Sequence, residues 1–110
     1  MRQSRREAKA QTFKLTEIRE ALISAGFDTT TKQAAALGVG RSTAYALLNL
    51  DKRAGPSATV VRRILSSATL PRRARRKIEE YVEDKIGGRY GHSERRARAF
   101  RQVLRIYSRP

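Results

Sequence analysis

The amino-acid sequence predicts an all-α protein, and three observations support that fold class. Alanine, leucine, arginine and glutamate, which favour helices, are abundant. Apolar residues recur at spacings of three and four, and the alternation of apolar and polar residues that is typical of strands is absent. Glycine and proline separate these apolar segments. A chain of 110 residues can bury one modest core. We therefore expect six short helices that pack around that single core.

The chain begins with a basic arm followed by a helix. Residues 1–12 are polar and lack periodic apolar positions, which predicts a mobile arm that can extend the first helix. The arm either follows a nucleic-acid groove or has no defined structure. Both interpretations stay open for its basic residues, Arg2, Arg5, Arg6 and Lys9. The first helix is expected over residues 13–25 and ends at Gly26. Its buried face is predicted to contain Phe13, Ile18, Leu22 and Ala25.

Two short helices follow, separated by a glycine-rich turn. The threonines at 29–31 offer an N-cap for a helix that ends at Leu37. Residues 38–40, Gly-Val-Gly, interrupt it, and a third helix is expected from Arg41 or Ser42 to about Leu50. Residues 52–56 form a loop because they contain a glycine–proline pair.

The C-terminal half is predicted to contain three more helices. Ser57 can cap a fourth helix, Pro71 suits the first turn of a fifth, and Ser93 can cap a sixth after the break at residues 87–88. The buried face of the fourth helix is Val60, Val61, Ile64 and Leu65. That of the fifth is Ala74, Ile78, Tyr81 and Lys85, widened by Val82 and Ile86. That of the sixth is Ala97, Phe100, Leu104 and Tyr107.

Residues 30–49 carry the most specific pattern in the chain. Two short helices can cross steeply if the turn accepts a left-handed backbone, which Gly38 does without a Cβ penalty. Ala34, four residues earlier, lets the helices approach closely. Leu37, Val39 and Leu47 are spaced to fill the inside of this corner. The residues left on or beside the outer face of the third helix are Arg41, Ser42, Thr43, Tyr45, Ala46 and Asn49.

This stretch resembles the helix-turn-helix of the lambda-repressor-like superfamily, which includes phage repressors, Cro proteins and LacI-type headpieces. The resemblance covers residues 13–69 in the order of elements and is strongest over residues 30–49. It implies a four- to five-helix DNA-binding bundle with a C-terminal helical extension. Ala44 departs from the family, which usually has valine or isoleucine there; the Tyr45 ring or Leu48 would partly fill that space.

The resemblance also implies roles for individual residues. Residues that open the recognition helix reach base edges in the major groove, which assigns base reading to Arg41 and Ser42 and contact with a thymine methyl to Ala46. Arginine can pair bidentately with guanine. Contacts with the DNA backbone are expected from Thr30, Thr31, Lys32, Thr43, Tyr45, Asn49, Lys52 and Arg53. For Tyr45, filling the core is an equally good interpretation.

The charge of the chain favours a polyanionic partner. Lysine and arginine number 25 against 10 acidic residues, a formal net charge of +15, and duplex DNA is the first candidate because neutralised phosphates release counterions. An anionic membrane is the second candidate. Residues 30–69 contain six basic residues and only one acidic residue, as expected for a surface that faces phosphate. Without cysteine, an apolar span or a signal segment, the chain is expected to be a soluble intracellular protein. The resemblance to the lambda-repressor-like superfamily implies a place in the bacterial cytoplasm or nucleoid.

No catalytic, metal or cofactor pattern is present in the sequence. His92 is the only histidine, and without a second histidine or a cysteine to complete a metal site it is interpreted as a structural loop residue. A small-molecule effector is not evident. The densest basic run, residues 72–77, precedes four acids that can form i,i+4 pairs, so a solvated helix face is favoured there over DNA contact.

We therefore expect a sequence-specific regulator of transcription, most simply a repressor. The predicted organisation is an arm (1–12), a DNA-binding domain (13–69) and a basic helical extension (70–110). The extension is the candidate interface of a homodimer, unless it packs back on the domain. Two other functions stay open: a nucleic-acid-binding or architectural protein without base reading, and an antitoxin-like adaptor whose C-terminal helices bind a protein partner.

Overall fold

The protein folds into helices only, as the sequence predicts. A computed structural model describes residues 3–49, 55–91 and 94–107, without the side chains of Leu104, Ile106 and Tyr107. Within these ranges there are six helices and no strand. They are α1 (Arg5–Ser24), α2 (Thr30–Leu37), α3 (Arg41–Asn49), α4 (Ala58–Leu65), α5 (Arg72–Ile86) and α6 (Glu94–Tyr107).

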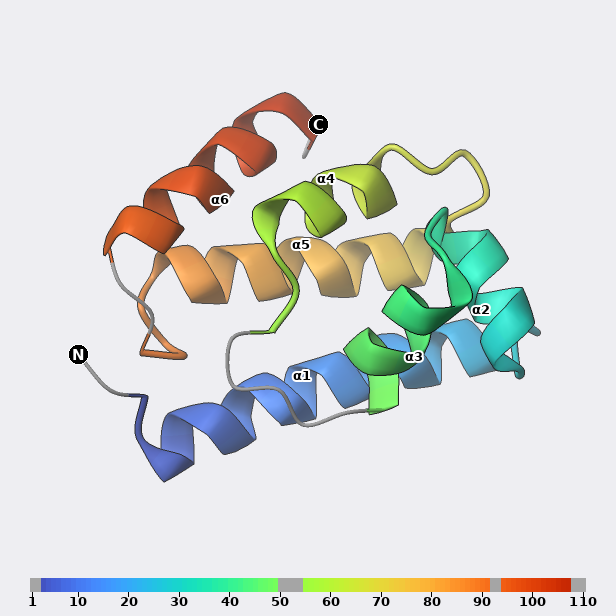
Figure 1. Ribbon diagram of the computed structural model, residues 1–110, viewed down its shortest axis with the longest axis horizontal. Helices are drawn as coiled ribbons and strands as arrows, with labels where there is room; N and C mark the ends of the chain where they lie inside the picture. Colours follow the sequence, from blue (N-terminus) through green and yellow to red (C-terminus); the bar gives the residue numbers. More distant parts are fainter. Residues whose placement is uncertain (1–2, 50–54, 92–93, 108–110) are drawn as a thin grey trace.

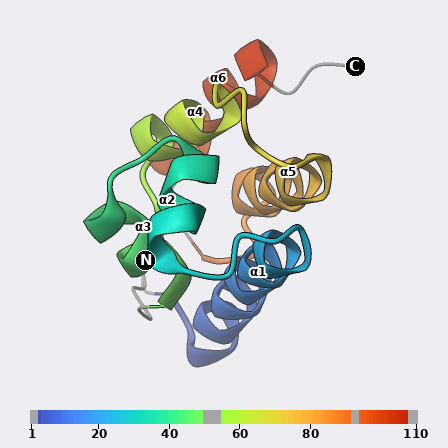
Figure 2. The same ribbon diagram turned by 90° about the vertical axis from the view of Figure 1, so that its right-hand side faces the viewer.

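The helices surround one hydrophobic core. Helix α5 lies between α1 and α6 and packs against both, and α4 covers α6 on one side of the molecule (Figure 1). The short helices α2 and α3 pack against each other, and seen from the side they lie opposite α5 with the core between them (Figure 2). Ile18, Leu37, Ile64 and Val82, which come from four different helices, are all buried in this core.

Helix α1 begins eight residues earlier than expected, at Arg5 rather than at Phe13. Ser4 caps it: the Ser4 hydroxyl accepts from the Glu7 amide at 3.0 Å, and the Glu7 carboxylate accepts from the Ser4 amide at 2.9 Å. This reciprocal capping box satisfies two backbone donors that a helix start leaves unpaired. The Gln3 side chain also donates to the Tyr90 carbonyl at 2.8 Å. The predicted arm is therefore helical from Arg5 on, and its start is anchored to the α5–α6 turn.

The predicted buried face of α1 is wrong at its two ends. Ile18 and Leu22 are buried, but Phe13 is 66% exposed and Ala25 is exposed too. The face that enters the core is instead formed by Gln11, Leu15, Ile18, Ala21 and Leu22. Gln11, Leu15, Ile18 and Leu22 follow helical spacings of three and four, whereas Phe13 lies five residues before Ile18. Phe13 then falls on the outer side and lines a shallow groove between α1 and α5.

The C-terminal helices follow the sequence prediction closely. On α5, Ala74, Ile78, Tyr81, Val82 and Lys85 are buried. On α6, Ala97 and Phe100 are buried, whereas Ser93 and the side chains of Leu104 and Tyr107 lie outside the described residues. The described apolar side chains of these two faces pack inside the chain, and the extension packs back on the domain. The homodimer interface predicted for the extension stays a prediction.

Lys85 lies in the core although it carries an amine. Its side chain is 1% exposed, and its ammonium lies 4.7 Å from the centroid of the Phe100 ring. Lys85 Nζ donates to the Tyr81 hydroxyl at 3.0 Å, and that hydroxyl donates to Gln11 Oε1 at 2.7 Å. Tyr81 stacks on Tyr90 at 5.3 Å between ring centroids. This polar chain joins α1 to α5 beneath α6.

Burial lowers the pKa of Lys85 to about 7, with a smaller contribution from the charge of Arg96. Because the unfolded chain holds this proton up to about pH 10, the unfolded state binds more protons than the folded state between pH 7 and pH 10. We therefore expect the free energy of unfolding to rise over this range by up to about 1 kcal/mol per pH unit. Burial raises the pKa of Tyr81 and Tyr90, so stability falls again above about pH 10.

Urea unfolding at pH 7, 8 and 9 measures this rise, and it should largely disappear in Lys85→Met. Lys9→Met, a change at an exposed lysine of α1, is the control and should keep the wild-type rise. An equally steep rise in Lys85→Met would show that the buried amine is not its cause.

Candidate nucleic-acid interface

The corner between α2 and α3 is built as the sequence predicts. Gly38 ends α2 in the left-handed conformation, with φ of 73°, and its amide donates to the Ala34 carbonyl at 2.9 Å. Ala34 and Leu37 are buried, and Val39 packs half-buried against the core. Helix α2 is capped at its start by Thr29, whose hydroxyl accepts from the Lys32 amide at 3.1 Å. The two helices thus meet at a tight turn of three residues.

The last turn of α2 is also held from outside the corner. Ser67 Oγ donates to the Ala36 carbonyl at 2.8 Å, and Thr69 Oγ1 donates to the Ala35 carbonyl at 3.1 Å. Carbonyls at the end of a helix have no partner within the helix, so these hydroxyls from the α4–α5 connection satisfy them. The connection therefore fixes α2 relative to α4. Nothing in the sequence pattern pointed to Ser67 or Thr69, since their partners are backbone atoms that are 31 and 34 positions away.

Helix α3 has an inner and an outer face. Ala44, Leu47 and Leu48 are buried on the inner face. At Ala44, where the resemblance implies a larger residue, the side chain is fully buried, and Leu48, one turn further on, is buried too. Tyr45 does not fill that space, because it is 50% exposed on the outer face. The core interpretation of Tyr45 is therefore wrong, and its contact with a DNA backbone stays a prediction.

The predicted base-reading residues lie together at the start of α3. Arg41 and Ser42 are exposed, and Ala46 is half-buried one turn further on. Ser42 and Ala46 line a groove between α3 and α4 with a volume of about 340 Å³. Thr43 lines the same groove, whose opposite wall is formed by Pro56, Ser57 and Val60. The start of α3 thus presents an exposed cation beside a hollow lined by apolar residues and by the hydroxyl side chains of Ser42, Thr43 and Ser57.

The predicted backbone contacts divide into two groups. At the start of α2, Thr31 and Lys32 are exposed and Thr30 is half-buried, and Lys32 forms an exposed ion pair with Asp28 at 3.2 Å. Asn49 is exposed, and its side chain also bonds within the protein: its Oδ1 accepts from Arg19 at 3.0 Å and its amide nitrogen donates to the Tyr45 carbonyl at 3.3 Å. Asn49 thereby ties the end of α3 to α1. Lys52 and Arg53 lie outside the described residues.

Charge is distributed unevenly over the helices. Between Thr29 and Ile78 the only acidic residue in the sequence is Asp51, so α2, α3 and α4 have none. Two acids of α1 and α5 pair with basic side chains of the same two helices: Lys14 contacts Glu80 at 2.9 Å and Glu17 at 3.0 Å. The Glu80 carboxylate also pairs with Lys77 at 3.4 Å. Helices α1 and α5 thus mix acidic with basic residues, whereas the charged residues of α2, α3 and α4 are all basic.

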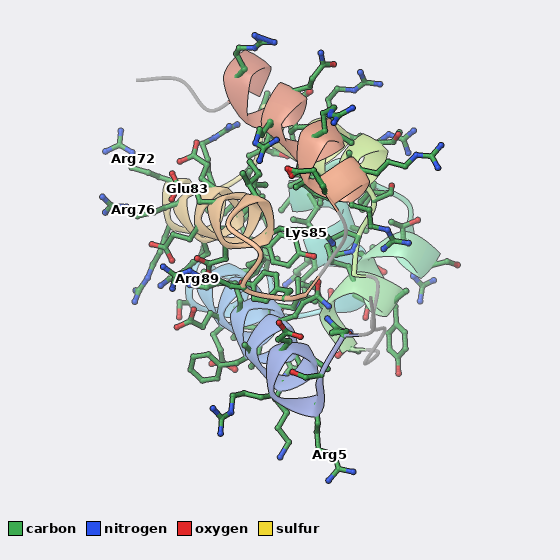
Figure 3. The ribbon with its side chains drawn as sticks, turned by 90° about the vertical axis from the view of Figure 1, so that its left-hand side faces the viewer. Arg5, Arg72, Arg76, Glu83, Lys85 and Arg89 are labelled. Carbon is green, nitrogen blue, oxygen red and sulfur yellow. The ribbon has the colours of Figure 1, made fainter. Side chains whose placement is uncertain are left out.

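The basic run on α5 was expected to be a solvated face, and its described side chains agree with that. Arg72, Arg73 and Arg76 are exposed, and Arg72 and Arg76 extend away from the rest of the molecule (Figure 3). Arg75 folds back and donates to the Leu65 carbonyl at 2.8 Å.

Comparison with protein-family models, with curated proteins and with solved structures finds no match for the chain. The function is therefore argued from the site itself. In the described part of the chain, no helix has the length and apolar character needed to cross a membrane. The same residues contain no group of histidine, cysteine or acidic side chains arranged to hold a metal ion.

Proposed function

We propose that this protein binds duplex DNA sequence-specifically and regulates transcription, most simply as a repressor that occupies a promoter. The observation that carries the proposal is the division of α3. Its inner face is locked into the core by Ala44, Leu47 and Leu48, while Arg41 and Ser42 stand exposed at its start. Helix-turn-helix proteins place a rigid helix of this kind, which follows a tight turn and presents polar side chains at its start, in the major groove.

The charge distribution supports duplex DNA as the partner. The interface helices α2, α3 and α4 lack acids, so a phosphate backbone could approach them without like-charge repulsion. In this proposal Arg41 donates to guanine O6 and N7, and Ser42 and Ala46 contact neighbouring base edges. Thr31, Lys32 and Tyr45 contact the backbone on either side, together with Thr30 and Thr43. Asn49 acts indirectly, since its side chain positions the end of α3 against Arg19.

Selection of bound sites from a random duplex library tests this proposal. A specific regulator should enrich one motif, and affinity for that motif should exceed affinity for its shuffled version by about 10³-fold or more. No enrichment, with equal affinity for both duplexes, would contradict base reading and favour the non-specific alternative. Two half-sites separated by about one helical turn would indicate that the protein binds as the predicted homodimer.

A further inference from the structure

Three neighbouring hollows on the surface share lining residues, and together they are called the channel here. The groove between α3 and α4 shares Gly55, Pro56 and Ser57 with a second cavity of about 260 Å³, which is bordered by α6. That cavity shares Ala58 and Ala99 with a third hollow of about 150 Å³ between α4 and α6. The channel therefore leads from the start of α3, past the start of α4, to the outer face of α6.

The described charged residues that line this channel are all basic, and the rest of its lining is apolar or polar and uncharged. Arg96 and Lys85 line its middle part, and Arg62, Thr59 and Gln102 line its end. None of the described lining residues is acidic. The groove between α1 and α5, in contrast, is lined by Glu17 and Glu20 as well as Arg73 and Lys77. The channel, unlike the α1–α5 groove, thus combines a hollow shape with a single sign of charge among its described lining residues, which favours a polyanionic occupant.

We propose that this channel is a second DNA-backbone contact, in which Arg62 of α4 and Arg96 of α6 hold the phosphates of the same duplex whose bases α3 reads. This inference rests on the proposed function and adds α6 to its binding surface. The dimensions permit it: the longest extent of the protein is 37 Å, close to one turn of B-DNA, about 34–36 Å. Contacts at α3 and at α6 therefore fall within a single turn of duplex.

The salt dependence of binding tests the inference. Each phosphate that a basic side chain neutralises makes the slope of log affinity against log salt concentration steeper by about 0.9. For the selected duplex, the double variant Arg62→Gln/Arg96→Gln should reduce the steepness of this slope by about 2, with little change in the preference over the shuffled duplex. The matched control is Arg72→Gln/Arg76→Gln, which removes two exposed arginines of α5 that do not line the channel and extend away from the rest of the molecule (Figure 3). Its slope should stay close to that of the wild type.

Two further variants guard against an effect on folding. Arg62→Gln alone changes an exposed side chain of α4 and should reduce the slope by about 1. Arg62→Lys/Arg96→Lys retains both charges and should keep the wild-type slope, because counterion release depends on charge.

The outcomes separate this inference from the proposed function. The protein could discriminate between the selected and the shuffled duplex while the double variant keeps the wild-type slope. That outcome overturns the channel but leaves the proposed function standing. Equal reductions by the double variant and its α5 control also overturn the channel, because the effect would then be one of total charge. A reduced slope without any discrimination supports the channel and contradicts sequence-specific reading. A wild-type protein that binds no duplex overturns both.

Discussion

Replacing Arg41 with alanine is expected to weaken binding to the selected duplex by about 5- to 150-fold, or ~1–3 kcal/mol, the range that one bidentate arginine–guanine contact contributes. Arg41 is exposed at the first position of α3. Its removal should leave the core unchanged, because the buried residues of α3 begin at Ala44. Affinity for the shuffled duplex should fall much less, since that duplex lacks the guanine. Titration of labelled selected and shuffled duplexes measures both effects.

Lys32→Ala is the matched comparison for Arg41→Ala. Lys32 is exposed at the start of α2, and its ion pair with Asp28 is itself exposed, so the change should cost little stability. A phosphate contact should weaken binding to both duplexes by the same factor. If Arg41→Ala behaves in that way too, Arg41 contacts the backbone and its assignment to base reading is wrong.

Gly55→Ala is expected to lower the free energy of unfolding by about 2–4 kcal/mol, through backbone strain and a disrupted buried hydrogen bond. Gly55 has φ of 69°, a left-handed conformation that alanine adopts only at a cost. A Cβ at this position would also overlap the Tyr81 hydroxyl and Gln11 Oε1. These two atoms are hydrogen-bonded to each other in the core, so the methyl group would have to separate them or push the loop outward.

Gly88→Ala separates the two causes of this loss. Gly88 has φ of 79°, but a Cβ there would meet no atom within 4 Å. It should therefore cost only the backbone strain, about 1–2 kcal/mol. Urea unfolding of both variants gives the comparison. Equal losses would mean that the loop at Gly55 yields to the methyl group and is not packed tightly on the core.

The sequence predicted those parts of the fold whose causes are local. Gly38 and Ala34 could be interpreted correctly because a left-handed turn and a close helix contact each depend on a single residue type. The early start of α1 was also within reach, since Ser4 and Glu7 have the spacing of a capping box. It was missed because residues 1–12 lack apolar periodicity, which is a weaker criterion than a cap. The misplacement of Phe13 had a different cause, because its separation of five residues from Ile18 does not fit one helical face.

Other features depend on which helices become neighbours, and periodicity does not encode that. The spacing on α5 correctly predicted that Lys85 is on the buried face. It did not predict the hydrogen bond of Lys85 to Tyr81, or that Tyr81 in turn bonds to Gln11. The channel likewise requires that residues 55–57 lie between α3 and α6. Pattern analysis identified the start of α3 as the candidate site, whereas the contribution of α6 emerged only from the assembled structure.

The two faces of α3 keep stability and recognition on different residues. Ala44, Leu47 and Leu48 hold the helix in the core, whereas Arg41, Ser42 and Tyr45 lie outside it. Changes at the outer positions therefore carry little energetic penalty for folding. In the proposed function, such a helix could acquire a new target sequence in single steps, each of which leaves a folded protein. The scaffold would thus be suited to retargeting, both in evolution and in the laboratory.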